Sequence, residues 1–253
     1  MRKNPESVEG FFGVHAGDYA KSQSHAQGAD LIALVAALKT RPTDTALDVA
    51  TGTGFTAIAL ANGVKHVVGI DVTNEMLGEA RKLASAKGLS NVEFVIGDAL
   101  RMKFASSAFD IVTTRRATHH FQDVPKFLHE ASRVLKPGGR LGVVDMSPPE
   151  GAEAFSNKIE KLRDASHVEA FTPNRWKSMV TEASFQIRSL QVLGEHISFK
   201  RWLYPVELGG VEEASVRSAW REAGPEVRRL LRAEANGDIK GWTKSRIVLV
   251  AFK

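Results

Sequence analysis

The chain has 253 residues with an ordinary globular composition, 43% hydrophobic and 25% charged, and a net charge of +5 at pH 7. It contains no cysteine, which excludes disulfides and thiolate metal sites and fits a reducing compartment. The longest apolar run, residues 31–38, is far shorter than the roughly 18 residues of a membrane span, and no apolar signal-peptide core follows the N-terminus. We therefore expect a cytoplasmic protein with no membrane span.

The first 44 residues divide into two parts. Residues 11–27 are polar, contain glycines and show no clear periodicity, which predicts a loose lid. Leu31, Leu34 and Leu38 then recur on one face of a helix, which predicts a covering helix after the lid.

Residues 45–54 read T-A-L-D-V-A-T-G-T-G, an apolar run that ends in small residues and two glycines. The pattern predicts a buried strand, a tight turn and a helix that opens after the turn. This arrangement can hold a nucleotide-like ligand, because glycines let the backbone approach closely and the helix N-terminus offers unpaired N–H groups. The expected cradle consists of Ala50, Thr51, Gly52 and Gly54.

Three acids lie at the ends of predicted strands. Asp71 is placed to accept hydrogen bonds from both hydroxyls of a ribose, and Asp98 suits the exocyclic amine of an adenine. A carboxylate at Asp48, inside the turn, would repel a pyrophosphate but attract the ammonium of an amino-acid ligand. This charge disfavours a nicotinamide-dependent oxidoreductase, which is the alternative left open by the spacing of Gly52, Gly54 and Ala57.

Strands and helices alternate regularly over residues 45–146, which favours an α/β fold with a doubly wound parallel sheet. The ligand of such a sheet lies at the carboxyl ends of its strands. We expect a single domain with a lid and helix over residues 1–44 and the cofactor-binding core over 45–146. A substrate-side insertion would cover residues 147–185, and terminal strands with inserted helices would cover 186–253.

Taken in order, these motifs resemble the class I S-adenosylmethionine-dependent methyltransferases, in the branch that includes quinone-biosynthesis and other small-molecule enzymes. The resemblance covers about residues 19–185. It implies S-adenosylmethionine as the cofactor and a mostly parallel seven-stranded sheet with an antiparallel last strand and helical insertions. One departure is Ala50, where the family's loop usually has a glycine. The added methyl group is tolerable if the φ angle of Ala50 is negative.

The resemblance also assigns cofactor contacts to individual residues. An aromatic residue of the lid would fold over the cofactor, and here it would be Tyr19, for which a packing role is equally open. The other contacts would be Asp48 at the ammonium, Asp71 at the ribose, Val72 and Ala99 at the adenine faces, Asp98 at its amine, and Arg115 through its backbone.

The catalytic residues carry a weaker signal, because methyl transfer needs a base only when the acceptor must lose a proton. His119 follows the fourth predicted strand and borders the methyl group in the resembling fold, where it acts as a general base or caps the next helix. His167 lies in a segment similar to one that closes the acceptor pocket in that branch, so it ranks above His119. His25 is a further candidate from the lid. No H-x-x-x-H spacing is present, and we expect no metal site.

The acceptor is expected to be a small, aromatic or lipophilic molecule methylated at oxygen or carbon. An Asn/Asp-Pro-Pro-Tyr/Phe motif, which would mark methylation of amines, is absent. A non-catalytic S-adenosylmethionine-binding accessory protein is the other alternative. The oligomeric state stays open, with a homodimer among the options.

Two sets of residues in the last third of the chain can each be interpreted in two ways. The four tryptophans line an acceptor pocket or, as is more common, anchor a helical cap. Five arginines in the helical stretch over residues 211–235 alternate with glutamates, which favours a solvated surface over a nucleic-acid patch. We expect a small-molecule partner and no nucleic acid.

Overall fold

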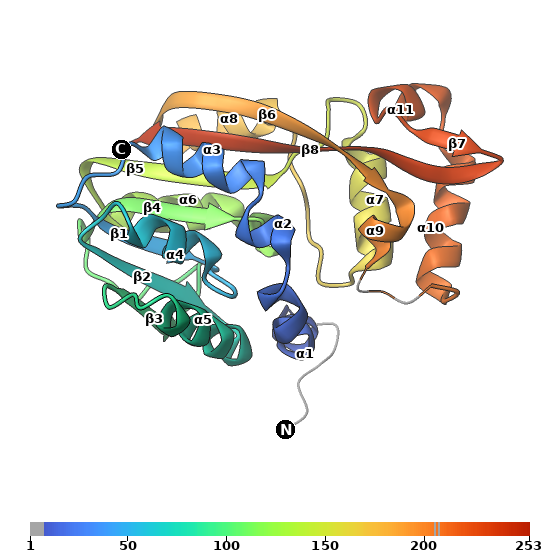
Figure 1. Ribbon diagram of the computed structural model, residues 1–253. Helices are drawn as coiled ribbons and strands as arrows, with labels where there is room; N and C mark the ends of the chain where they lie inside the picture. The colour runs from blue at the N-terminus through green and yellow to red at the C-terminus, as the bar shows by residue number, and fades with distance from the viewer. Residues whose placement is uncertain (1–7, 205, 207) are drawn as a thin grey trace.

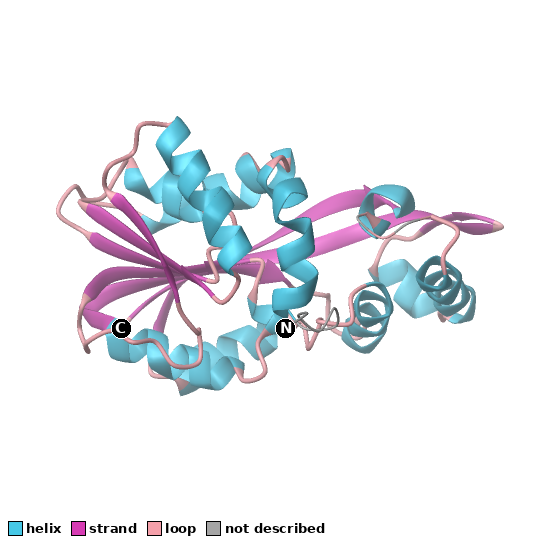
Figure 2. Cartoon of the chain, turned by 90° about the horizontal axis from the view of Figure 1, so that it is seen from below, coloured by secondary structure: helices cyan, strands magenta, loops and turns pink. Residues whose placement is uncertain are grey.

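The computed structural model describes residues 8–204, 206 and 208–253 (Figure 1). Helices cover both faces of one twisted sheet, and a helical lobe extends from one end of it (Figures 1 and 2). Within these residues, no helix is long and apolar enough to cross a membrane. The strands are β1 (Thr45–Val49), β2 (His66–Asp71), β3 (Val92–Ile96), β4 (Phe109–Arg115), β5 (Leu135–Met146), β6 (Gln186–Ser198), β7 (Glu234–Asn236) and β8 (Asp238–Phe252).

The helices alternate with the strands through the first half of the chain and gather in the lobe in the second half. They are α1 (Val8–Ala20), α2 (Gln23–Ala26), α3 (Ala29–Leu38), α4 (Phe55–Ala61), α5 (Asn74–Ala86), α6 (Val124–Val134), α7 (Glu153–Arg163), α8 (Pro173–Glu182), α9 (Phe199–Leu203), α10 (Val211–Glu222) and α11 (Pro225–Leu230), with a 3₁₀ turn at Thr118–His120.

The sheet has the strand order β3-β2-β1-β4-β5-β8-β6, and the short β7 pairs with β8 off this path. The first five strands are parallel, and β8 runs antiparallel to both of its neighbours. The predicted seven-stranded, mostly parallel sheet with an antiparallel last strand is therefore confirmed. The strand order reverses between β1 and β4, which is where a doubly wound sheet opens a crevice for a ligand.

Both faces of the sheet are buried, and β1 shows how. Leu47 and Val49 pack into the cluster beneath α6 and α8, while Ala46 packs into the cluster beneath α3, α4 and α5. Successive side chains of a strand point to opposite faces, so a strand covered on both sides is largely apolar, and a buried polar side chain such as Asp48 needs hydrogen-bond partners. This is why the predicted strands of the core read as continuous apolar runs.

The N-terminal segment differs from the prediction. Residues 11–27 were expected to form a loose lid, but most of them lie in α1 and α2. The apolar residues of α1 do not gather on one side, so the sequence carries no amphipathic signal. Its helical state is supported by packing against α5 rather than by its own periodicity.

The helical lobe is built on the ends of β6 and β8, which run beyond the parallel strands (Figure 1). Trp202, Trp220 and Trp242 form the centre of its separate hydrophobic cluster, and Trp176 lies in the main core under α8. All four are at most 3% exposed, so they anchor hydrophobic clusters, and Trp202 also borders a cavity described below. The helical stretch predicted over residues 211–235 is wrong at its end, because the last helix stops at Leu230 and β7 follows.

Candidate active site

A cavity of about 260 Å³ lies at the carboxyl ends of β1 to β4, with α1 forming one wall. It stands at the point where the strand order reverses, as the sequence predicted. The cavity brings together most of the residues expected at a cofactor: Tyr19, Ala50, Thr51, Gly52, Asp71, Val72, Asp98, Ala99 and Arg115.

Asp71 organises the loop at the mouth of this cavity. Its Oδ2 accepts a hydrogen bond from the Gly52 N–H at 2.8 Å, and its Oδ1 accepts one from the Thr73 N–H at 2.9 Å. Burial raises the pKa of this carboxyl, and the two backbone N–H groups oppose the rise. Asp71 therefore fixes the glycine loop against β2 while it faces the cavity.

Asp48 lies elsewhere than expected, because it does not line the cavity. It is 1% exposed, and its two oxygens accept hydrogen bonds from the hydroxyls of Thr51, at 2.6 Å, and Thr113, at 2.7 Å. Burial raises the pKa of Asp48 to about 6 against the opposing effect of these bonds. The geometry thus gives Asp48 the task of bracing the loop beneath the cavity.

Gly54 also lies outside the lining. It has a φ angle of 82°, and a Cβ atom at this position would stand 2.8 Å from the Phe94 ring and 2.9 Å from the Ala80 side chain. A glycine is needed here because the loop turns closely over β3 and α5.

Ala50 does not meet the condition set by the sequence, since its φ angle is 53°. This is the left-handed region, which costs an L-residue with a Cβ atom roughly 1–2 kcal/mol. The missing glycine is therefore replaced by a strained alanine rather than by a relaxed one. Strain of this kind is common in loops that hold a ligand.

The described residues fit a nucleoside joined to an amino acid. Asp71 presents a carboxylate at the tip of β2, and Asp98 is an exposed carboxylate at the tip of β3. Gly52 has a φ angle of 55°, and a Cβ atom added there would meet nothing within 4 Å, so the backbone is open to the cavity. The remaining lining is largely apolar and includes Val72 and Met76, which suits an adenine ring.

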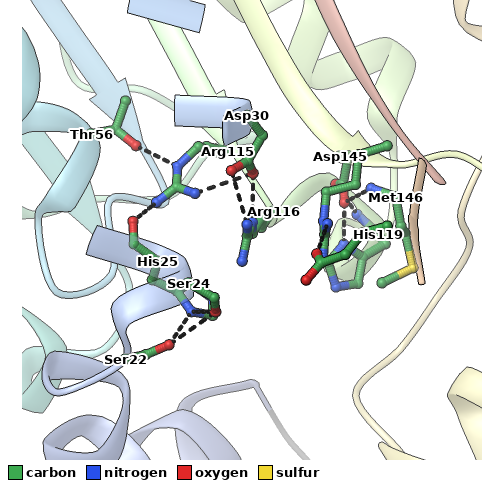
Figure 3. A network of polar contacts seen from close by, with 12 residues as sticks. Ser22, Ser24, His25, Asp30, Thr56, Arg115, Arg116, His119, Asp145 and Met146 are labelled. Atoms are coloured by element: carbon green, nitrogen blue, oxygen red, sulfur yellow. Dashed lines mark hydrogen bonds and ion pairs between the residues drawn. The ribbon is translucent and has the colours of Figure 1, made fainter. Parts of the chain in front are cut away.

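Arg115 uses its side chain to tie the N-terminal helices to the sheet. Its Nε donates to the Thr56 hydroxyl at 3.1 Å, and its Nη2 donates to the His25 carbonyl oxygen at 2.5 Å. Its Nη1 lies 3.3 Å from Asp30, which Arg116 also contacts (Figure 3). This network seats α2 over the cavity.

A second cavity of about 290 Å³ adjoins the first. Its walls come from α1, α2, the end of β5, and the lobe elements α7, α9, β6 and β8. The two cavities share five lining residues: Phe12, Tyr19, His25, Arg116 and His120. Phe12 stacks near Tyr19 and His120, with ring centroids 5.3 and 5.1 Å apart, so an aromatic partition separates the two spaces.

His119 lines the second cavity and is held by Asp145 at the end of β5 (Figure 3). The distance from His119 Nδ1 to Asp145 Oδ1 is 2.6 Å, and the backbone N–H of His119 donates to Asp145 Oδ2 at 3.0 Å. Burial alone would raise the pKa of Asp145, but the charge and hydrogen bond of His119 hold it well below its usual range. Ionised Asp145 can only accept, so Nδ1 carries a proton, and Nε2 has a free lone pair when the ring is in its neutral form.

His167 lines neither cavity, although the sequence ranked it above His119. Its Nε2 lies 2.8 Å from Asn157 Oδ1, which also accepts from the Ala170 N–H, and its Nδ1 is buried without a partner among the described residues. Burial lowers its pKa to about 4, and the neighbouring His119 adds to the shift. His167 therefore packs behind His119, at a ring distance of 5.6 Å.

The sequence reasoning missed several residues of the site. Asp145 carried the same signal as the other three acids, a carboxylate at the end of an apolar strand, and this signal identifies it once it is applied to β5. Phe12 and Asp30 gave no comparable signal, because their positions depend on how α1 and α3 dock.

The comparisons with known proteins decide the family. A family profile described as "Methyltransferase domain" matches residues 41–196, which is more than half of the chain. The chain belongs to the class I S-adenosylmethionine-dependent methyltransferases. This membership excludes the nicotinamide-dependent alternative, and the cofactor of the methyltransferase is S-adenosylmethionine.

Individual relatives of this methyltransferase agree with the assignment. The uncharacterized methyltransferase YcgJ of Bacillus subtilis is 34% identical over 76% of this chain and 77% of the relative. The crystal structure of YcgJ gives a TM-score of 0.84 at 30% identity and covers 88% of this chain and 97% of that chain. The demethylmenaquinone methyltransferase of Thermus thermophilus is 38% identical over 56% of this chain and 74% of the relative.

Proposed function

We propose that this methyltransferase methylates an oxygen or an acidic carbon of a small aromatic or lipophilic molecule bound in the second cavity. The observation that carries the proposal is the His119–Asp145 pair on the wall of that cavity, next to the partition shared with the cofactor cavity. The name of the demethylmenaquinone methyltransferase relative supports an acceptor of this class.

The residues of the first cavity would hold the cofactor, with Asp71 at the ribose, Asp98 at the adenine amine, and Val72 and Ala99 at its faces. When bound, S-adenosylmethionine supplies an electrophilic methyl group on a sulfonium. The protein's own task is to align the acceptor, to exclude water and to take up a proton where the acceptor must lose one.

His119 is suited to take up that proton. Its Nε2 receives the acceptor proton while Asp145, through Nδ1, keeps the ring in the correct tautomer and stabilises the imidazolium that forms. His120 is a poorer base, because burial and the neighbouring His119 lower its pKa to about 3. The proton leaves to solvent after the methylated product and S-adenosylhomocysteine have formed.

The aromatic and apolar part of the acceptor would lie against Phe12, Tyr19 and Trp202, all of which line the second cavity. These side chains offer flat apolar surfaces at low entropic cost. The expected preference is for a planar or branched apolar body with one acidic hydroxyl or carbon.

The experiment is incubation of the protein with S-adenosylmethionine labelled in the methyl group and a metabolite extract. We expect a small molecule that gains the label, detected by mass spectrometry, and none with heat-denatured protein. If the protein binds the cofactor in calorimetry but labels nothing across extracts from several growth conditions, the accessory-protein alternative is correct.

A further inference from the structure

The second cavity is bordered by cationic side chains from separate parts of the chain. This distribution is unexpected for a cavity that takes a purely lipophilic molecule, because charged groups are costly to desolvate without a partner. The cations are Arg116 after β4, Arg163 at the end of α7, Arg201 in α9, and Lys244 and Arg246 in β8.

Arg116 and Arg246 keep unused hydrogen-bond donors. Arg116 donates Nε and Nη2 to Asp30 at 2.7 and 2.9 Å, and Arg246 donates Nη1 to Glu195 at 3.1 Å. In the described part of the chain, Nη1 of Arg116 and both Nε and Nη2 of Arg246 have no acceptor. Both side chains are mostly buried, with 13% and 14% exposed. Two guanidinium groups thus offer free donors to one cavity.

The carboxylates next to these two arginines do not balance the positive charge. Four guanidinium groups share two carboxylates, since Asp30 serves Arg115 and Arg116, while Glu195 serves Arg201 and Arg246. The other acids of the lining contact other groups and make no ion pair with Arg116 or Arg246 in the described residues: Asp145 contacts His119, Asp164 contacts Ser166, and Asp18 contacts His15.

The positive charges of Lys244 and Arg163, which also line the second cavity, are better balanced by nearby carboxylates. Lys244 and Arg163 both contact Glu160, at 2.5 and 3.2 Å, and the charge of Asp164 also acts on Arg163. The local excess of positive charge therefore lies around Arg116 and Arg246, where four guanidinium groups contact two carboxylates.

The positive charges of the arginines act on one another and on a neighbouring histidine. Burial lowers the pKa of Arg246, and the charge of Arg116 lowers it further. Burial also holds the pKa of His25 well below its usual value, and Arg116, Arg115 and Arg246 add to this effect. His25 is consequently neutral at pH 7 and adds no charge, and an anion between Arg116 and Arg246 would relieve the repulsion.

We propose, resting on the function proposed above, that the acceptor carries an oxyanion, a carboxylate or a phosphate, which binds between Arg116 and Arg246. A guanidinium group presents paired donors that match either oxyanion. Arg116 and His119 line the same cavity and lie on facing sides of the space drawn in Figure 3. The anionic group would therefore anchor the acceptor at one wall while its acidic hydroxyl or carbon faces His119.

The arrangement also selects against neutral analogues. A neutral molecule of the same shape would cover the free donors of both arginines without pairing them, and unpaired buried donors are penalised. The anionic group thus determines specificity, and the apolar walls supply contact surface for the rest of the acceptor.

The test uses the protein saturated with S-adenosylhomocysteine and measures binding of benzoate, phenyl phosphate and the neutral isostere benzamide by calorimetry. We expect one oxyanion to bind at least about tenfold more tightly than benzamide, the scale of one charge-assisted hydrogen bond. The tighter of the two identifies a carboxylate or a phosphate as the group. Arg246→Gln and, separately, Arg116→Gln should each remove most of this preference. The exposed Arg229→Gln is the control.

The outcomes separate this inference from the proposed function. Because Arg116 also lines the first cavity, a native circular-dichroism spectrum and a cooperative thermal transition are used to show that each variant is folded. Failure of the unmodified protein to bind S-adenosylhomocysteine would count against the methyltransferase site itself. Equal binding of benzoate, phenyl phosphate and benzamide, or no oxyanion binding at millimolar concentration, would overturn the anion site alone. The anion site would also be overturned if Arg116→Gln and Arg246→Gln both keep the full preference for an oxyanion over benzamide.

Discussion

The two cavities of this methyltransferase are built in opposite ways. The first lies at the ends of four adjacent strands, and nearly all of its lining comes from one stretch, residues 50–122, with α1 added. The second collects residues from 12 to 246, out of seven helices and strands and the 3₁₀ turn, and nine of its twenty lining residues are charged. On the proposed function, a cofactor shared by a whole family would be held by a local motif, whereas the acceptor would be held by residues from distant parts of the chain that meet at the same edge.

The largest expected effect tests whether the second cavity serves catalysis and the first cavity serves cofactor binding. His119→Ala should lower kcat by about 10²–10⁴-fold, the range for a lost general base, and leave cofactor affinity unchanged. Single-turnover assays on the identified acceptor and calorimetry with S-adenosylhomocysteine measure the two quantities. The control is His66→Ala, a change at a half-exposed surface residue. Full turnover in the His119 variant would mean that catalysis is alignment alone.

The second prediction tests whether Asp48 is a brace or a ligand contact. Its pKa of about 6 in the folded protein exceeds the unfolded value of 3.8. The unfolded chain therefore ionises first as the pH rises, and folding loses up to about 3 kcal/mol between pH 4 and 6. Asp48→Asn should recover much of this loss at pH 8 and little at pH 4, in urea unfolding.

Asp123→Asn, which retains a good helix cap on the surface, is the control for the Asp48 variant. Equal destabilisation by Asp48→Asn at both pH values would contradict the raised pKa of Asp48. A large drop in cofactor affinity in the same variant would support the contact between Asp48 and the cofactor ammonium that the sequence predicted.

Asp71→Ala should weaken S-adenosylhomocysteine binding by about 1.5–3 kcal/mol, the scale for hydrogen bonds to a charged group. Part of the loss would come from the glycine loop, which Asp71 holds through the Gly52 N–H. Asp71→Asn keeps an acceptor for this N–H and should lose less. Calorimetry gives the affinities, and Glu93→Ala on the exposed side of β3 is the control. Unchanged affinity in both variants removes Asp71 from the cofactor site.

The smallest expected effect concerns the strained position in the loop. Ala50→Gly should stabilise the protein by about 0.5–1 kcal/mol, because relief of the left-handed strain exceeds the added entropy of the unfolded chain. Thermal unfolding without cofactor measures the change. A lower melting temperature would show that the loop relaxes in another way.

The contrast also explains what the sequence could predict. The core strands, the reversal point and nine of the cofactor-cavity residues follow from a local pattern, since apolar runs and glycines act within a few residues. The places of Asp48 and His167 did not follow, because whether a polar group faces a cavity or a hydrogen-bond partner depends on packing from elsewhere. Asp48 accepts a hydrogen bond from Thr113, 65 positions away, and His167, in the loop after α7, is held by Asn157 of that helix.

The helicity of α1 and the charged wall of the second cavity were also beyond the sequence. The first depends on contact with α5, and the second depends on the register of β8, which places Lys244 and Arg246 on the same side of one strand. Neither contact leaves a periodic trace in the residues that make it.

The aromatic partition makes the two ligands thermodynamically dependent on each other. Phe12 and Tyr19 line both cavities, so the ligand that binds first restricts these side chains for the second, and we expect positive cooperativity. Linkage requires each ligand to change the affinity for the other by the same factor. Titrations of S-adenosylhomocysteine and an oxyanion probe, in either order, measure these two factors. Phe12→Ala should bring both factors toward one. A coupled pair of this kind would retain the acceptor preferentially when the methyl donor is also in place.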